Sequence, residues 1–409
     1  MHQHLVEGVL LPFLQFLVIL AVVITFAKLG GYLSLRLGQP AVAGEVLAGL
    51  ILGPTVIDFL HWPFITDIHI EETLTFMAEL GVLLLLFIAG LEVHFSDMLR
   101  SGRVAAYAGL LGFLAPLGLG YMLAIFFGFT PNQALFIGML LAPTSVSISA
   151  QTLMEIGALR GRVGVGLLGA AVIDDSLVVL GVSFLLAVLG GSQVTSTGSV
   201  LILLLRMFAF IAIAFGAGYM FIPRLTKWSE GMPISQSLIA FAFTTMIFYA
   251  WAAEVLGGLA TIIGAFIAGL LFARSEFKER ILQGFSIIAY GIFVPIFFVD
   301  VGLAVDLGSL SPSNVWLLVA MLSVAVLSKI IGSGLGGLLA GFSRRESLQL
   351  GFGMVPRGEV VLIVAAVGIT EGFITQAELS VAVAMVVLTT LLTPPILRTL
   401  FAKQSEGNA

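Results

Sequence analysis

Long apolar segments recur along this chain of 409 residues, and their length suits the interior of a lipid bilayer. A helix needs about 20 apolar residues to cross a hydrocarbon core of about 30 Å. Such segments lie near 9–30, 40–60, 73–93, 104–127, 133–156, 163–189, 200–222, 235–256, 258–274, 283–304, 314–340, 347–369 and 378–400. The sequence therefore predicts an all-α polytopic membrane protein with about 13 transmembrane helices. The cut at 256–259 is the weakest, so a count of twelve or fourteen stays open.

The composition excludes several other classes of protein. Only 10% of the residues are charged, against about 25% in soluble domains, and 59% are hydrophobic. A net charge of −5 without a basic run argues against nucleic-acid binding. The chain has no cysteine, which excludes disulfides and thiolate chemistry. Residues 1–8 carry no Lys or Arg, so we expect no signal peptide, and the first segment stays as a helix.

Positive charges alternate from loop to loop. Lys or Arg residues occur in every second loop, beginning with Lys28 and Arg36 and ending with Arg398 and Lys403. The intervening loops, near 61–70, 128–132, 190–199, 305–313 and 370–377, contain none. Cytoplasmic loops are the ones that carry excess Lys and Arg. The N-terminus is therefore predicted to lie outside and the C-terminus in the cytoplasm.

Thirteen segments also suggest an internal duplication. Repeat one would span about 9–190, a linker helix about 200–222, and an inverted repeat two about 235–402. Inverted repeats are common in transporters, with the substrate site at mid-membrane between them.

Two adjacent carboxylates lie midway along the sixth segment, at Asp174 and Asp175. An ionisable group at the bilayer centre is costly, so it points to function. Adjacent helical residues point about 100° apart. One carboxylate can therefore be paired while the other stays available to titrate.

Lys329 lies midway along the eleventh segment. A buried lysine without a partner would lose its proton, and a neighbouring aspartate offsets that penalty. We therefore expect a salt bridge between Lys329 and one of the two aspartates. A bound cation or proton could break this pair.

Two predicted helices are interrupted at similar depths, by Pro143 in the fifth segment and by Pro356 in the twelfth. A proline inside a helix removes a backbone hydrogen bond, and unwound backbone is tolerated in a membrane only where it is buried in protein or lines a cavity. The freed carbonyls, with the hydroxyls of Thr144 and Ser145, are oxygen ligands suited to a small alkali cation. Paired breaks of this kind indicate a binding site.

Other intramembrane charges have supporting roles. Arg357 and Glu359 flank the second break, where they would neutralise the dipoles of the half-helices. Glu79 and Asp300 are candidates for an ion funnel.

These features together resemble the cation/proton antiporter superfamily, in the monovalent cation:proton antiporter-2 branch with NapA-like Na⁺/H⁺ antiporters and Kef-type K⁺ efflux systems. The resemblance covers nearly the whole chain. It includes the segments 44–54 and 79–92, the Asp-Asp pair, the lysine helix and the run Pro-Arg-Gly-Glu at 356–359.

The resemblance implies a homodimer in which two sets of helices move relative to each other like an elevator. The core, ion-binding helices would be about 104–190 and 314–402. The dimerisation or panel helices would be about 9–93 and 235–304. The two broken helices would cross beside the aspartates.

The resemblance also implies the roles of individual residues. Asp175 would carry the ion and the proton, and Asp174 would pair with Lys329. Na⁺ would be held at Asp175, Asp174 and Thr144, with Ser145 beside them. No cofactor and no enzymatic activity are expected.

One departure narrows the choice of cation. Kef-type proteins have Gln-Asp where this chain has Asp174-Asp175, and they usually carry a cytoplasmic nucleotide-binding domain, which we do not expect after Leu400. Both differences favour an electrogenic Na⁺(Li⁺)/H⁺ antiporter of a prokaryotic inner membrane. A K⁺/H⁺ or broad cation antiporter is the first alternative, and a Na⁺-coupled solute symporter is the second. An intramembrane aspartyl protease would need its two aspartates to converge from two helices. Here Asp174 and Asp175 are neighbours on one predicted helix, which argues against that function.

Overall fold

The computed structural model describes residues 2–66, 69–93, 101–189, 197–304 and 312–402. Within these ranges the chain forms helices joined by turns, without a strand. Nine of the helices described are long and apolar enough to cross a membrane. The class predicted from the sequence, an all-helical polytopic membrane protein, is confirmed. The count of thirteen spans and the inverted repeat stay predictions.

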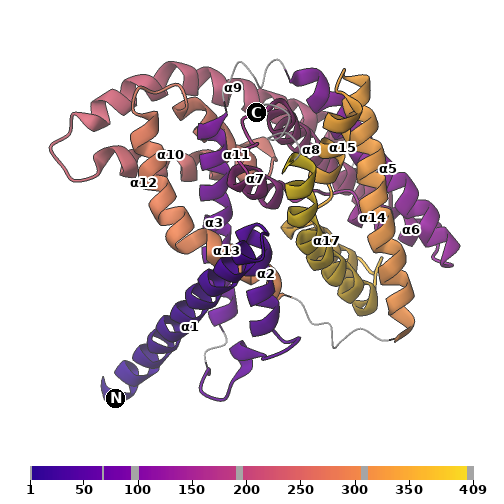
Figure 1. Cartoon of the computed structure of the whole chain (residues 1–409), viewed down its shortest axis with the longest axis horizontal. Helices are drawn as coiled ribbons and strands as arrows, with labels where there is room; N and C mark the ends of the chain where they lie inside the picture. Colours follow the sequence, from indigo (N-terminus) through magenta and orange to yellow (C-terminus); the bar gives the residue numbers. More distant parts are fainter. Residues whose placement is uncertain (1, 67–68, 94–100, 190–196, 305–311, 403–409) are drawn as a thin grey trace.

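The helices pack mainly within two groups, which lie beside each other in Figure 1. The first, here called the core group, contains α5 (Gly102–Phe126), α6 (Pro131–Leu140), α7 (Val146–Glu155), α8 (Arg162–Leu189), α14 (Pro312–Leu339), α15 (Arg344–Gly353), α16 (Glu359–Thr370) and α17 (Gln376–Ala402). The second, the panel group, contains α1 (His2–Arg36), α2 (Ala41–Leu52), η1 (Phe59–His61), α3 (Ile70–Glu92), α9 (Thr197–Glu230), α10 (Ser237–Ala252), η2 (Ala253–Gly257), α11 (Thr261–Phe272), α12 (Lys278–Ile288), η3 (Ala289–Phe293) and α13 (Val294–Leu303).

Each predicted segment overlaps one to three consecutive helical elements, but some boundaries differ. The segment predicted at 40–60 contains a helix of only 12 residues, which ends at Leu52. Pro54 follows closely, and the residue before a proline disfavours helical backbone. The weak cut at 256–259 coincides with a break between η2 and α11, where Gly258 has a φ of 64°. Glycine accepts this left-handed conformation without strain.

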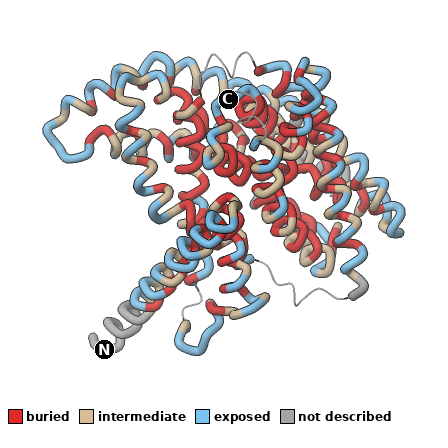
Figure 2. Tube along the Cα trace, viewed as in Figure 1, coloured by how far each residue is buried: buried red, intermediate tan, exposed pale blue. Residues whose placement is uncertain are grey.

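The pattern of buried and exposed side chains differs from that of a water-soluble protein. Buried residues lie between helices, and exposed residues line the outside (Figure 2). Large apolar side chains are prominent on that outside, for example Phe126 at 84%, Trp316 at 75% and Leu339 at 67% exposed. Such a surface fits contact with lipid, because membrane helices are apolar all round.

Glycines let helices inside each group approach closely. A Cβ on Gly49 of α2 would collide with the carbonyl of Val299 in α13, and a Cβ on Gly332 of α14 would collide with the carbonyl of Leu111 in α5. Small residues at membrane helix interfaces allow this backbone contact. Wherever a Cβ added to a described glycine would collide with the backbone of another helix, both helices belong to the same group. Each group is therefore internally interlocked, and the boundary between them is not.

We expect Gly332→Val to destabilise the core group because the added methyl groups have no room beside Leu111. Overpacking of this kind costs about 1–3 kcal/mol, and thermal unfolding in detergent measures it. The matched control is Gly118→Val in α5, because nothing lies within 4 Å of a Cβ at Gly118. Equal melting temperatures for the two variants would contradict the interlocked packing.

Candidate functional site

Two helix breaks lie against each other in the core group. The first, 141–145, separates α6 from α7, and the second, 354–358, separates α15 from α16. The backbone N–H of Ser145 donates to the carbonyl of Pro356 at 2.7 Å. Pro143 and Pro356 are both buried. The unwound backbone is therefore enclosed in protein, the condition under which a membrane tolerates it.

The hydroxyl of Thr144 in the first break satisfies a carbonyl of the second. Thr144 Oγ1 donates to the carbonyl of Met354 at 3.3 Å, and Ser145 Oγ lies 3.1 Å from Ser147 Oγ. The last carbonyls of a helix have no partner within that helix. Thr144 thus supports the end of α15, and its oxygen keeps lone pairs that a cation could use.

A fully buried arginine joins the first break to α14, the helix that carries Lys329. Arg357 donates from Nη1 to the carbonyls of Ala142 and Pro143, and from Nη2 to that of Ala325 at 3.0 Å. The carbonyl end of α6 carries partial negative charge. This geometry suits the dipole-neutralising role expected for Arg357. The side chain of Glu359 lies outside the residues described.

The buried lysine meets one of the two aspartates. Lys329 Nζ of α14 donates to both carboxylate oxygens of Asp174 in α8, at 2.9 Å each. Both side chains are completely buried. The structure thus forms the kind of lysine–aspartate pair that the sequence analysis expects. It joins two core helices through the middle of their length.

Asp175 points to a different place, the boundary between the groups. It is 2% exposed and borders a space of about 10 Å³. This space is lined by Val146, Leu168, Ala171 and Val172 of the core group and by Leu86, Ile262, Ile263 and Phe266 of the panel group. It holds about one water-sized particle at most. Asp174 is therefore committed to Lys329, while Asp175 faces the helices of the other group.

A cation at Asp175 would need oxygen ligands in addition to carboxylates. In the described ranges, no three acidic or histidine side chains converge as a metal site would require. The crossing supplies hydroxyl and carbonyl oxygens, which suit hard cations. Glu79 and Asp300 do not line the space beside Asp175. They interact electrostatically with each other in the panel group, where Thr75 Oγ1 donates to Asp300 at 3.5 Å.

Some residues that build the crossing escaped sequence analysis. Ser149 donates to the carbonyl of Gly353 at 2.5 Å. Thr389 accepts the backbone N–H of Arg357 at 3.2 Å, and Thr390 donates to its carbonyl at 3.1 Å. The adjacent threonines in an apolar helix were the available signal, and their partner lies more than 30 positions earlier in the chain.

Comparisons with known proteins place this chain in a family. The family model for the transmembrane sodium/hydrogen exchanger matches residues 19–403. The chain is 36% identical to the Na⁺/H⁺-K⁺ antiporter GerN of Bacillus cereus, over 96% of this chain and 98% of that protein. It is 33% identical to a Na⁺/H⁺ antiporter of Enterococcus hirae, over 97% of this chain and 100% of that protein.

A solved structure shares the fold at much lower identity. The sodium proton antiporter MjNhaP1 from Methanocaldococcus jannaschii matches with a TM-score of 0.70 and 16% identity, over 96% of this chain and 98% of that chain. The relatives named here are transporters rather than enzymes. Since the family model spans most of the sequence and the two bacterial relatives match along almost their whole length, the chain belongs to the transmembrane sodium/hydrogen exchanger family, within the cation/proton antiporter superfamily.

Proposed function

We propose that this protein is an electrogenic antiporter that exchanges Na⁺ or Li⁺ for H⁺ by alternating access at the two aspartates. One observation carries the proposal. Asp174 is held by the buried Lys329, whereas its neighbour Asp175 borders the boundary between the two helix groups. A carboxylate at such a boundary can be reached from either side of the membrane when one group moves.

Competition at Asp175 supplies the chemistry of exchange. When the site faces one side, a cation binds ionised Asp175 and displaces its proton. The added positive charge weakens the Asp174–Lys329 pair, so that the lysine also releases a proton. When the site faces the other side, protons displace the cation. Oxygens at the crossing, including Thr144 and Ser145, complete the cation shell, and neither ATP nor a cofactor is needed.

Coupling requires that the empty, charged site does not cross the membrane. Moving a bare charge through a low-dielectric barrier is costly, so the core group moves only when it is loaded or protonated. The glycine contacts support movement of the groups as units, because they interlock helices within a group. We assign the moving role to the core group and the fixed, dimerising role to the panel group.

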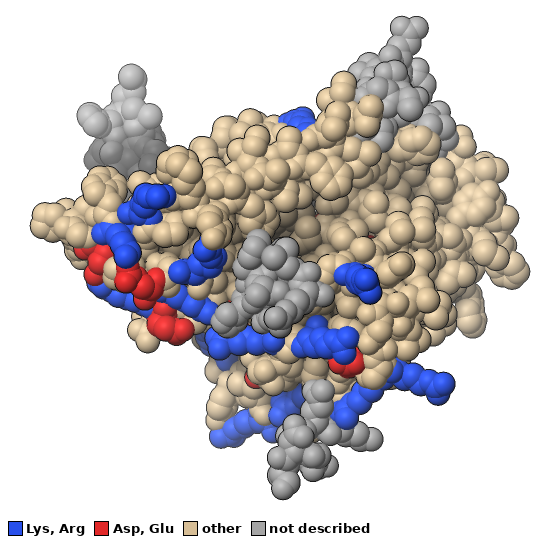
Figure 3. All heavy atoms as spheres, turned by 90° about the horizontal axis from the view of Figure 1, so that it is seen from above, with Lys and Arg blue, Asp and Glu red and all other residues tan. Residues whose placement is uncertain are grey.

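The charge distribution supports the proposed orientation across the membrane. Lys and Arg side chains gather on the face shown in Figure 3, which is the upper end of Figure 1, where α17 ends. We call it the C-terminal face and assign it to the cytoplasm. From the family to which the chain belongs we further propose a homodimer in a prokaryotic inner membrane, with a role in pH and sodium homeostasis. Glu79 and Asp300 would line the route for ions.

Two other functions stay as alternatives. The relative from Bacillus cereus is a Na⁺/H⁺-K⁺ antiporter, which favours K⁺/H⁺ or broad cation exchange as the first alternative. A Na⁺-coupled solute symporter is the second alternative. It would need a larger cavity than the space of about 10 Å³ beside Asp175.

We expect Na⁺ or Li⁺ pulses to release protons from proteoliposomes that contain a pH-sensitive dye, and an imposed voltage to change the rate. Asp175→Asn should reduce this response to the level of protein-free vesicles, because an amide cannot exchange a proton for a cation. The control is Glu346→Gln, which removes a charge at the C-terminal face and keeps the helix cap that Glu346 makes with Ser343.

Each result of this assay separates the alternatives. A response to K⁺ alone would favour the K⁺/H⁺ alternative. No proton movement with any cation would favour the symporter. Full activity of Asp175→Asn would remove Asp175 from the exchange mechanism.

The Asp174–Lys329 pair makes a separate prediction about stability. Lys329→Gln and Asp174→Asn each leave one buried charge without its partner, which costs about 3–5 kcal/mol. The double variant leaves no charge and should recover part of that loss. Thermal unfolding in detergent at one fixed pH measures all three. A double variant that loses the sum of the two single losses would show that the pair has no energetic coupling.

A further inference from the structure

The end of α7 supplies a cap for a helix of the other group. Glu155 is the last residue of α7, and its Oε2 accepts the backbone N–H of Ala41 at 2.8 Å. Ala41 opens α2, whose cap position holds Pro40 without a side-chain cap. The first N–H groups of a helix need acceptors and favour negative charge. A core-group carboxylate therefore replaces the cap that α2 lacks.

Glu155 is itself held in place for this contact. Its second carboxylate oxygen, Oε1, accepts a hydrogen bond from Gln151 at 2.9 Å, one turn earlier in α7. Both oxygens are thus engaged, one within α7 and one across the boundary between the groups. Two contacts of this kind orient the carboxylate toward the start of α2.

Two further contacts cross the boundary from the same stretch, 154–160. Tyr290 of η3 donates its hydroxyl to the sulfur of Met154 at 3.5 Å. Arg160 Nε, in the turn after α7, lies 3.7 Å from Glu92, the last residue of α3. One end of the broken helix therefore makes polar contacts with three separate elements of the panel group.

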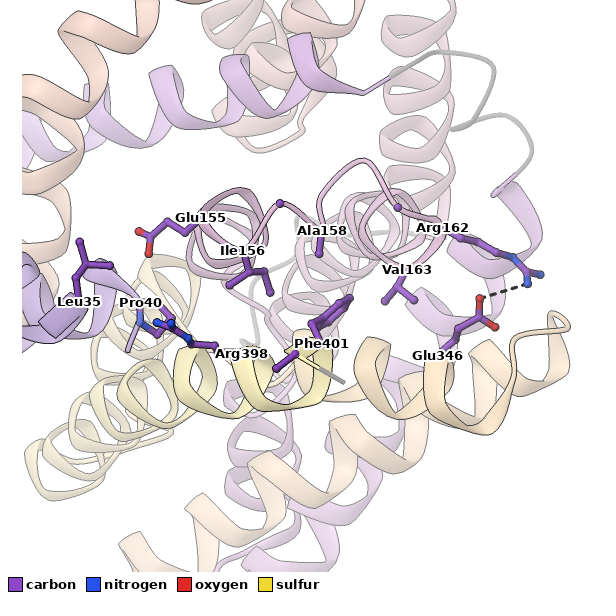
Figure 4. Close-up of a pocket in the computed structure, with 13 residues that line it drawn as sticks. Leu35, Pro40, Glu155, Ile156, Ala158, Arg162, Val163, Glu346, Arg398 and Phe401 are labelled. Atoms are coloured by element: carbon purple, nitrogen blue, oxygen red, sulfur yellow. Dashed lines mark hydrogen bonds and ion pairs between the residues drawn. The ribbon is translucent and has the colours of Figure 1, made fainter. Parts of the chain in front are cut away.

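A cavity of about 610 Å³ opens beside the contact between Glu155 and the start of α2 (Figure 4). Leu35 and Pro40 of the panel side form part of its wall, and Glu155, Arg398 and Phe401 of the core group form another part. Because its walls belong to both groups, any sliding of one group past the other would reshape it.

We propose that Glu155, Met154 and Arg160 form a latch that holds the core group against the panel group at the C-terminal face, and that this latch must open whenever the cation site opens to that face. The inference rests on the proposed function, because it requires movement between the groups. The Glu155 cap makes the closed state favourable, since opening removes the negative charge and the carboxylate acceptor from the start of α2. Glu155 therefore acts as a positioning residue, which sets how often the site faces each side.

The absence of cysteine makes a cross-linking test direct. The double variant Glu92→Cys/Arg160→Cys places one thiol on each side of the latch. Cross-linking of the two thiols in proteoliposomes with a bifunctional methanethiosulfonate reagent, whose spacer replaces the lost side-chain length, should abolish Na⁺-driven proton movement, and a reductant should restore it. The matched control is Arg162→Cys/Glu346→Cys, an ion pair at 3.5 Å that borders the same cavity within the core group. Its cross-linked form should keep transporting.

Full transport by the cross-linked Glu92/Arg160 pair, with the link verified by mass spectrometry, would overturn the latch. Reduced protein in the same vesicles tests the proposed function by itself. If the reduced protein and the unmodified chain both lack exchange, the proposed function fails, and transport then says nothing of the latch.

Hydrogen exchange reads the latch without any transport. In Glu155→Ala, amide exchange at the start of α2 and over 154–160 should be roughly fivefold faster, as loss of a helix cap predicts. Exchange in α14, which the latch does not touch, should stay unchanged. Glu346→Gln is again the control. Unchanged exchange at α2 in Glu155→Ala would contradict the latch, whether or not the cross-link forms.

Discussion

The buried pair between Asp174 and Lys329 is the interaction on which the site depends. Each charge alone would be expelled from a low-dielectric interior or neutralised there. Together they satisfy each other with two hydrogen bonds at 2.9 Å and join α8 to α14. The pair fixes the rotation of α8 about its axis. Because successive residues of a helix point about 100° apart, Asp175 then faces a different direction from Asp174. The contrast between the two neighbouring carboxylates follows from this one pair.

The crossing of the two helix breaks is built around the same region. Arg357 lies fully buried with its guanidinium on carbonyls of the first break and on Ala325 of the lysine helix. Its own backbone is held by threonines of α17. A positive charge at the carbonyl end of α6 offsets the half-helix dipole. The unwound backbone, the Asp174–Lys329 pair and Arg357 therefore stabilise one another. A change at one of them should alter the stability of the other two.

Outside this region, two kinds of contact divide the molecule. Within a group, glycines such as Gly49 and Gly332 allow backbone to touch backbone, which leaves no freedom to slide. Between the groups, apolar side chains and a few polar contacts meet, and Asp175 lies at that surface. Side-chain contacts of this sort can be exchanged for others at little cost, whereas interlocked backbones cannot. The contacts of 154–160 with the panel group are the polar part of this surface at the C-terminal face.

The sequence by itself determined the class of the protein and most of its candidate residues. Segment length and the excess of apolar residues require a membrane, and unexplained charges within apolar helices stand out because burial is so costly. Pro143 and Pro356 revealed the breaks because a proline cannot continue the hydrogen bonds of a helix. The sequence does not show which distant residues lie close together in space. The threonines that hold Arg357 and the cap that Glu155 gives to Ala41 depend on residues far apart in the chain. Those partners became visible only when the tertiary structure brought them within hydrogen-bond reach, because a local pattern encodes the shape of one helix but not which helix lies beside it.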